Sequence, residues 1–217
     1  MIEVLSGVLP GENSALDQAF RLRHAVFVEE RRWEALRRAD GREIDQFDDA
    51  DAVHLLATEH GLVLGYARLR STAQPTLLAE VHSFLSRLPC PRTPSVWEWT
   101  RYCVRPDRRS GNSPLGPVGS EIIVACVEWS LDHGIGDAVL EIHPAWEAFF
   151  TGLSFKVRRL GPTVEMDGEP VVAVQLRFDE RTLKFTREAR GVHWPVFAAG
   201  SARRRVAEMK ELKPLGG

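Results

Sequence analysis

Acidic side chains gather in one short segment of this sequence, and their crowding suggests a binding site. Residues 41–51 contain the carboxylates Glu43, Asp45, Asp48, Asp49 and Asp51. A solvated loop and a pocket for a cationic ligand both explain such a cluster. A calcium loop is disfavoured, because the D-x-D-x-D-G order and the distant Glu of that motif are missing. A non-enzymatic module that binds a metal ion or an acyl carrier is an alternative.

Other charged residues interrupt segments that otherwise have the composition of buried strands. Arg68 lies in "VLGYARLR", and Glu98 and Arg101 lie in the aromatic run "SVWEWTRYCV". Charges inside apolar strands are costly to bury unless they are paired. The carboxylates of the acidic segment are suitable partners for these arginines, and Arg23 is a further cation that can pair with them. The result is either an inert buried ion-pair network or a site that binds a charged ligand.

The elements that must position these residues follow from periodicity and breaker residues. Helical spacing begins after a capping Asn or Ser near residue 13, and residues 34–52 lack any period, which is typical of a long functional loop. Strands are expected at residues 2–5, 53–58, 62–70, 95–104, 137–143, 155–160 and 171–178, with a hairpin turn at 59–61. Helices are expected at residues 13–33, 75–88, 116–134 and 144–153.

This order of elements predicts an α/β (α+β) protein with a mixed twisted sheet and helices on both faces. The helix at 116–134 is expected to be amphipathic and to end at Gly134. No internal repeat or linker divides the chain, so residues 1–217 are expected to form a single domain. Residues 179–217 are expected to be a less regular tail, with a surface helix over 201–213.

The composition is that of an ordinary globular protein, with 44% hydrophobic and 27% charged residues. The 28 basic and 30 acidic residues give a net charge of −2, so nothing points to nucleic acid as a partner. Cys90, Cys103 and Cys126 are too widely spaced for a zinc site or a disulfide framework. No signal peptide follows Met1, and the apolar stretch 122–127 is too short to span a bilayer. We therefore expect a cytoplasmic protein without metal, nucleic-acid or membrane partners.

Four segments together resemble the acyl-homoserine-lactone synthases, the autoinducer synthases of bacterial quorum sensing: "RHAVFVEERRW", "REIDQFDDADAVHLLA", "VLGYARL" and "WEWTRYCV". The family pattern is an Arg three residues before Val-Phe, a Trp six residues after that Phe, then E-x-D-x-(aromatic)-D, Gly-x-x-Arg and Trp-Glu-x-(Ser/Thr)-Arg. The matching positions are Arg23, Phe27, Trp33, Glu43, Asp45, Asp48, Arg68, Glu98 and Arg101.

The resemblance implies a fold similar to the Gcn5-related N-acyltransferases, with a V-shaped cleft between two splayed central strands. It also implies the substrates, S-adenosylmethionine and an acyl thioester on coenzyme A or acyl carrier protein, and no cofactor. The products would be an N-acyl-homoserine lactone, methylthioadenosine and the free thiol carrier. An acetyl-coenzyme A-dependent small-molecule N-acetyltransferase is the alternative, although the pyrophosphate-loop spacing of such enzymes fails around Arg108, Arg109 and Gly111.

The resemblance also assigns roles within the predicted site. Glu98 and Arg101 are the expected catalytic residues, with Glu98 as the base that keeps the attacking amine neutral. Asp45 and Asp48 are expected to meet the sulfonium and ammonium groups, and Arg68 or Arg101 to hold the carboxylate. The aromatic rings are expected to cover the adenine or sulfonium. The residues expected to bind S-adenosylmethionine are therefore Arg23, Phe27, Trp33, Asp45, Asp48 and Arg68.

The expected acyl pocket consists of Thr100, Leu140, Trp146 and Phe149. Leu140 falls where the family uses Thr for 3-oxo acyl chains, so an apolar residue there favours an unsubstituted or branched acyl group. His82 stands where the family has a Phe, and we interpret it as a partly exposed helix residue. Strand alternation would place Glu98 and Arg101 on opposite faces, so a β-bulge between them is required if both face the cleft.

Overall fold

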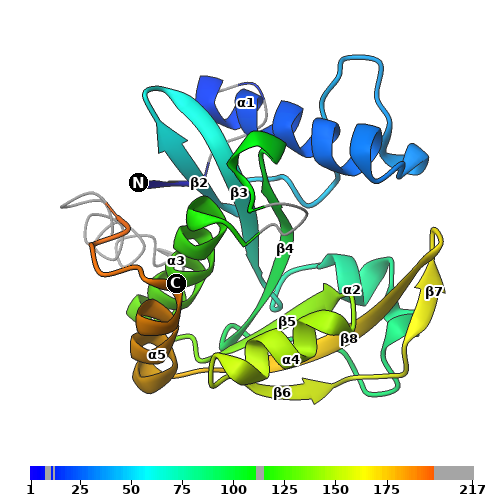
Figure 1. Ribbon diagram of the computed structural model, residues 1–217. Helices are drawn as coiled ribbons and strands as arrows, with labels where there is room; N and C mark the ends of the chain where they lie inside the picture. Colours follow the sequence, from blue (N-terminus) through cyan, green and yellow to red (C-terminus); the bar gives the residue numbers. More distant parts are fainter. Residues whose placement is uncertain (8–10, 12, 111–114, 198–217) are drawn as a thin grey trace, which may run out of the picture.

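The computed structural model describes residues 1–7, 11, 13–110 and 115–197. In this part of the chain eight strands form one sheet in the order β1-β2-β3-β4-β5-β8-β6, and β7 pairs with β8 (Figure 1). The pairings are antiparallel except for β4 with β5, which is parallel. The strands are β1 Ile2–Ser6, β2 Val53–Glu59, β3 Leu62–Ser71, β4 Val96–Val104, β5 Asp137–Ile142, β6 Lys156–Arg159, β7 Val164–Met166 and β8 Glu169–Arg177.

Helices cover both faces of this sheet. They are α1 Ser14–Arg23, α2 Leu77–Glu80, α3 Pro117–Asp132, α4 Ala145–Gly152 and α5 Glu180–Arg190, and α1 continues directly into a π-helix, His24–Glu30. Shorter 3₁₀ turns are Glu34–Leu36, Ser83–Leu85 and Pro106–Arg108. The mixed α/β fold with helices on both faces, predicted from the sequence, is confirmed.

Side-chain alternation along β2 and β3 separates two hydrophobic cores. Leu56 and Tyr66 pack with Phe20 of α1, whereas Leu55 and Ala67 pack in the larger core with α3. The positions of Gly65 and Arg68 on β3 follow from this division into two faces. A Cβ at residue 65 would lie 2.5 Å from Ile122 Cδ1, so only glycine permits the approach of α3, while Arg68 points to the α1 side.

The two halves of the sheet separate at its centre. Parallel pairing of β4 with β5 ends at Glu98 and Val139, although β4 continues to Val104 and β5 to Ile142. Figure 1 shows the strands diverging beyond this point, with β1–β4 in the upper half and β5, β8 and β6 in the lower half. The splayed central strands expected from the resemblance are therefore present.

A β-bulge lies on β4 near this divergence. Tyr66 of β3 faces Cys103, and Arg68 faces Thr100, so a single β3 residue lies opposite two residues of β4. Arg101 has φ of +57°, which is uncommon for a residue with a Cβ. Backbone held in such a conformation costs about 1–3 kcal/mol and is concentrated at functional sites. The bulge brings Arg101 to the same face as Glu98, which resolves the alternation problem.

Several sequence-based expectations differ from the structure. The helix α3 is buried around most of its circumference rather than amphipathic, because the sheet covers one side and α5 another. Residues 180–190 form a regular helix in the expected tail, capped by Asp179 and ended by Gly191. The three-residue strand β7 was not expected. The surface helix expected at 201–213 lies outside the described residues.

Candidate active site

Three arginines and three carboxylates meet on the α1 side of the sheet. Arg23 comes from the last residue of α1, Arg68 from β3 and Arg101 from the bulge on β4, and Glu43, Asp45 and Asp48 come from the loop before β2. We call these six residues the arginine–carboxylate network. Opposite charges are equal in number, so the network is neutral as a whole.

Short ion pairs connect the members. Arg23 donates to Glu43 at 2.5 Å and to both oxygens of Asp48 at 2.7 and 2.9 Å. Arg68 donates to both oxygens of Asp45 at 2.5 and 3.0 Å and to Asp48 at 2.8 Å. Two-pronged contacts of this kind fix the orientation of both partners.

Arg101 completes the network. It donates to Glu43 at 3.1 Å and to Asp45 at 2.9 Å. The loop is held in shape by its own side chains, because Asp48 accepts the backbone N–H of Asp45 at 2.9 Å and Asp45 accepts that of Phe47 at 2.9 Å. The acidic segment is therefore a built structure and not a solvated loop.

The carboxylates remain ionised despite their burial. Burial alone would raise the pKa of Asp48, but the charges of Arg23 and Arg68 outweigh it and hold that pKa far below its usual range. The pKa of Glu43 is likewise lowered, because Arg23 and Arg101 overcome the effect of burial. Removing one partner from such a buried set leaves an uncompensated charge and typically costs about 3–5 kcal/mol.

Only two members of the network reach the protein surface. The exposed fractions of the side chains are 12% for Asp45 and 8% for Arg101, against 0% for Arg23, Arg68 and Asp48. Asp48, Arg23 and Arg68, which were expected to bind the substrate, are buried behind Asp45 and Arg101. Asp48 and Arg68 contact Asp45 directly, whereas Arg23 pairs with Glu43, which Arg101 also contacts.

Phe27 and Trp33 lie beside the exposed edge of the network. Their rings are stacked with centroids 5.2 Å apart and planes 8° apart, and the Arg101 guanidinium lies 5.9 Å from the Phe27 ring centroid. The π-helix after α1 carries Phe27, and single π turns inside helices are frequent at functional sites. The structure thus brings both aromatic residues to the site, as the sequence predicted.

Two polar residues behind Arg23, Tyr66 and His54, were not predicted from the sequence to belong to the site. The hydroxyl of Tyr66 accepts a hydrogen bond from Arg23 at 3.4 Å and lies 2.6 Å from Nδ1 of His54. Burial lowers the pKa of His54 to about 4, so its ring is neutral at physiological pH. Glu43 was part of the recognised motif but was not assigned to the site. The signal that could have found Tyr66 and His54 is their polarity within apolar strands.

Glu98 lies at the point where β4 and β5 separate, and it has a structural partner of its own. Its two oxygens accept the backbone N–H groups of Leu77 at 3.0 Å and Leu78 at 2.8 Å, at the start of α2. Burial raises the pKa of Glu98, and the two N–H groups only partly oppose that effect. A carboxyl group with a raised pKa is suited to proton transfer near neutral pH.

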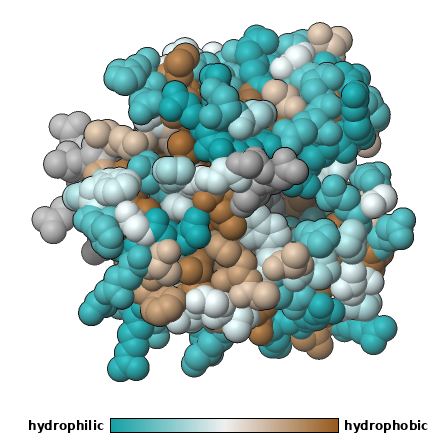
Figure 2. All heavy atoms as spheres, viewed as in Figure 1, coloured by the Kyte–Doolittle hydropathy of each residue, from teal (hydrophilic) through white to brown (hydrophobic). Residues whose placement is uncertain are grey.

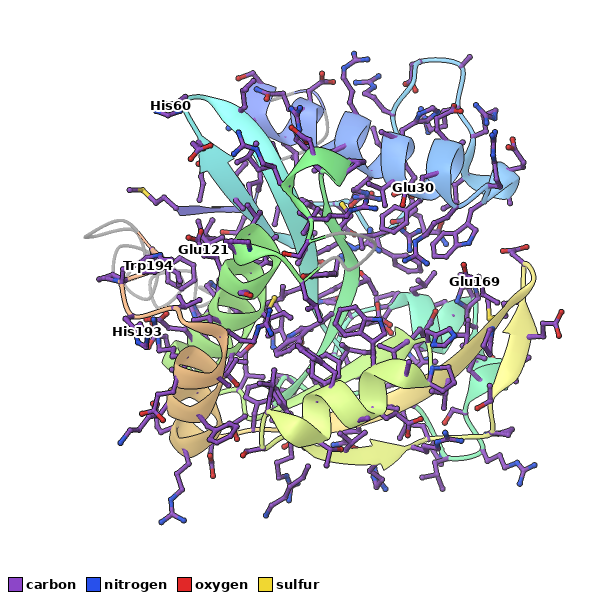
Figure 3. The ribbon with its side chains drawn as sticks, viewed as in Figure 1. Glu30, His60, Glu121, Glu169, His193 and Trp194 are labelled. Carbon is purple, nitrogen blue, oxygen red and sulfur yellow. The ribbon has the colours of Figure 1, made fainter. Side chains whose placement is uncertain are left out.

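Three of the four residues expected in the acyl pocket lie in one hydrophobic cluster. Leu140 belongs to the larger core, and the partly buried Trp146 and Phe149 pack against it with their ring centroids 5.1 Å apart. Figure 2 shows apolar residues gathered on the middle of this face, between α3 and α4. The hydroxyl of Thr100 instead accepts a hydrogen bond from Arg68 at 3.1 Å, on the α1 side. Thr100 is therefore a neighbour of the arginine–carboxylate network.

Membrane spans and metal sites were sought among the described residues. No helix among them combines the length and apolar character that a membrane span needs. Nor does this part of the chain place three or more His, Cys, Asp or Glu side chains where they could hold a metal ion. A surface cavity of about 400 Å³ beside Thr58, Arg108 and Glu121 is lined by none of the predicted site residues.

The sheet order and the separation of β4 from β5 define the fold of the acyl-CoA N-acyltransferases. A solved acyl-CoA N-acyltransferase from Pseudomonas aeruginosa shares it, with a TM-score of 0.57, 16% identity and coverage of 81% of this chain and 97% of its own. Residues 10–185 also match the family model described as autoinducer synthase. The chain belongs to the autoinducer synthase family, as its motifs indicated, and the prediction of an acyltransferase enzyme is confirmed.

Individual relatives agree with this assignment. The isovaleryl-homoserine lactone synthase of Bradyrhizobium diazoefficiens is 39% identical over 178 residues, 82% of this chain and 79% of the relative. The acyl-homoserine-lactone synthase of Pseudomonas aeruginosa is 30% identical over 188 residues, 85% of this chain and 90% of the relative. The solved coenzyme A-dependent acyl-homoserine lactone synthase BjaI, with S-adenosylmethionine and isopentyl-coenzyme A, has a TM-score of 0.82 and 35% identity, and covers 96% of this chain and 99% of its own.

Proposed function

We propose that this protein synthesises an N-acyl-homoserine lactone signal from S-adenosylmethionine and an acyl thioester, with release of methylthioadenosine. The observation that supports it best is the exposed edge of the arginine–carboxylate network, where Asp45 and Arg101 lie side by side at 2.9 Å next to the stacked rings of Phe27 and Trp33. An anion, a cation and a π-surface together match a substrate that carries a carboxylate, a sulfonium and an adenine ring.

In this proposal Arg101 binds the carboxylate of S-adenosylmethionine and Asp45 faces its cationic groups. Phe27 and Trp33 cover the sulfonium or adenine, which contributes about 0.5–2 kcal/mol where a cation lies over a ring. Arg23, Arg68 and Asp48 position these residues from behind, since they are buried. A neutral network that is already hydrogen-bonded needs little reorganisation when the substrate arrives.

The first chemical step is acylation of the α-amino group. Free α-amino groups have a pKa of about 7.7–8.0, so a modest base suffices to keep the nitrogen neutral near pH 7. Glu98 is that base in our proposal, directly or through a water. In the second step the substrate carboxylate attacks its own γ-carbon and expels methylthioadenosine. The protein mainly has to hold the chain in a ring-closing conformation.

The acyl group lies on the other side of the central strands, against Leu140, Trp146 and Phe149. An apolar pocket lined by aromatic rings favours a branched or unsubstituted acyl chain. The similarity to an isovaleryl-homoserine lactone synthase and to a coenzyme A-dependent synthase supports a short branched acyl-coenzyme A as the donor. An acyl carrier protein remains the alternative donor. We further propose that the chain works as one cytoplasmic domain, without a cofactor.

One assay separates this proposal from its rival. The purified protein is incubated with S-adenosylmethionine and a panel of acyl-coenzyme A and acyl-carrier thioesters, and methylthioadenosine is measured. The proposal predicts methylthioadenosine only when an acyl donor is present. Absence of methylthioadenosine across the panel, together with acetyl transfer to other amines, would instead establish a small-molecule N-acetyltransferase.

A further inference from the structure

His82 and Glu141 form a partly buried pair that the proposed chemistry does not use. His82 follows α2, and its Nδ1 lies 2.7 Å from Oε2 of Glu141 on β5. The side chains are 22% and 13% exposed. The sequence-based interpretation of His82 as a partly exposed helix residue therefore omits its main contact.

The pair lies at the separation of the two central strands. Glu141 is two residues beyond Val139, whose partner Glu98 is the last β4 residue paired with β5. Val139 and Leu78 share one hydrophobic cluster, which places α2 against this part of β5. Glu98 and Arg101 of β4 both act electrostatically on His82, so the His82–Glu141 pair lies near the site proposed above.

One oxygen of Glu141 has no partner. Oε1 is buried and accepts no hydrogen bond from any described residue, while Oε2 is held by His82. A buried carboxylate oxygen without a hydrogen-bond donor is unfavourable. Its free lone pairs therefore suit a donor that arrives with the substrate. Glu98 differs, because each of its oxygens already accepts a backbone N–H.

We propose that Glu141 is a further catalytic residue of the acylation step and that His82 is its positioning residue. The inference rests on the function proposed above. Acylation removes two protons from the ammonium nitrogen of S-adenosylmethionine. The first leaves before attack, through Glu98. The second leaves as the C–N bond forms, and Glu141 Oε1 accepts it.

The atoms balance without another reactant. The neutral amine attacks the thioester carbonyl carbon, the C–N bond forms and the C–S bond breaks. The proton passes from nitrogen to Glu141 Oε1 and then to the departing thiolate, which leaves as a thiol. His82 donates its Nδ1–H to Oε2 throughout and keeps Oε1 directed at the nitrogen. The hydrogen bond to Glu141 raises the pKa of His82 against the effect of burial, which favours this donating state.

The test separates the two chemical steps. Acylation is followed by single-turnover formation of the N-acylated product from S-adenosylmethionine and isovaleryl-coenzyme A. Lactonisation alone is followed by methylthioadenosine release from synthetic N-isovaleryl-S-adenosylmethionine. We expect Glu141→Gln to slow acylation about 10²-fold or more, the usual range for loss of general base catalysis, and to change lactonisation less than about twofold.

Matched variants make the result specific. His82→Phe removes the orienting donor and should slow acylation about tenfold, whereas His82→Gln retains a side-chain N–H and should recover part of that loss. Glu147→Gln is the control, because Glu147 pairs with Arg159 at 2.6 Å on the exposed side of α4 and should leave both steps unchanged. Each variant is checked for its melting temperature.

The outcomes are distinguishable. Slower acylation with normal lactonisation in Glu141→Gln supports the inference. Normal acylation in that variant overturns it and leaves the proposed function intact, as long as the unaltered protein forms methylthioadenosine. Equal loss of both steps with a lower melting temperature also overturns it, since the pair would then be structural. No methylthioadenosine from the unaltered protein would overturn the proposed function itself, and the inference with it.

Discussion

The clearest consequence of the site geometry is a difference between two neighbouring aspartates. Asp48→Asn and Asp45→Asn make the same chemical change in the same loop. Asp48 is completely buried and contacts both Arg23 and Arg68, whereas the Asp45 side chain is 12% exposed. We expect the Asp48 substitution to act mainly on stability and the Asp45 substitution mainly on substrate binding.

The magnitudes follow from the contacts. Asp48 accepts three hydrogen bonds from arginine and one from the backbone N–H of Asp45, and its neutralisation leaves a buried cation uncompensated. That costs about 3–5 kcal/mol, or a fall in melting temperature of about 6–20 °C for a chain of this size. At Asp45, water partly compensates for the lost charge, so we expect the free energy of unfolding to fall by about 1–3 kcal/mol.

Two measurements test this difference. Urea unfolding gives the free energy of unfolding of each variant, and methylthioadenosine formation at varied S-adenosylmethionine gives KM and kcat. Asp45→Asn should raise the KM for S-adenosylmethionine at least tenfold, which is about 1.4 kcal/mol of binding free energy. If Asp48→Asn is as stable as the unaltered protein, the buried network does not hold the site in the way argued above. If Asp45→Asn leaves KM unchanged, the ligand-facing role of Asp45 is wrong.

Three further predictions use the same site. Glu98→Gln should slow acylation about 10²-fold and lower the melting temperature slightly, because one of its two oxygen acceptors becomes an NH₂ group; unchanged single-turnover acylation would exclude Glu98 as the base. Arg101→Lys should raise the KM for S-adenosylmethionine about tenfold, because an ammonium cannot replace a planar two-pronged donor, and a steady-state titration with equal KM would contradict this. Because the pKa values of Glu43 and Asp48 are lowered in the folded protein, these groups stabilise the fold fully above about pH 5, and this stabilisation is lost progressively as the pH falls below about 4. Urea unfolding at pH 3.5–7 measures the free energy of unfolding, and a profile that does not change with pH would refute this prediction.

The fold was largely predictable because its strands are short apolar runs separated by strong breakers. The exceptions have local causes. The capping box of Asp179 and Thr182 and the terminal Gly191 were signals for α5, but they follow the last strand, where an irregular tail was assumed. Burial of α3 depends on α5 packing against it, which no periodicity within α3 itself encodes.

The residues of the site were predictable from the sequence, but how deeply each is buried was not. Ion pairing compels buried arginines and carboxylates to meet, so sequence spacing suffices to bring Asp45, Arg68 and Arg101 together. Which of these side chains faces a ligand depends on small differences in exposed fraction, 12% for Asp45 and 8% for Arg101 against 0% for Arg68, and tertiary packing sets those differences. The position of Thr100 depends on the strand register around the bulge, and the contact of His82 with Glu141 joins residues 59 positions apart.

Charge balance connects the two groups of residues in the site. The arginine–carboxylate network is neutral, but S-adenosylmethionine carries a sulfonium, an ammonium and one carboxylate, so it brings a net positive charge. The network can orient that substrate through Asp45 and Arg101, but it has no surplus anion to offer. Glu98 and Glu141 lie outside the network, on either side of the strand separation, and in the proposed reaction they take the protons of the ammonium. Binding and proton transfer are therefore assigned to different carboxylates, and a substitution in one group should leave the task of the other largely intact.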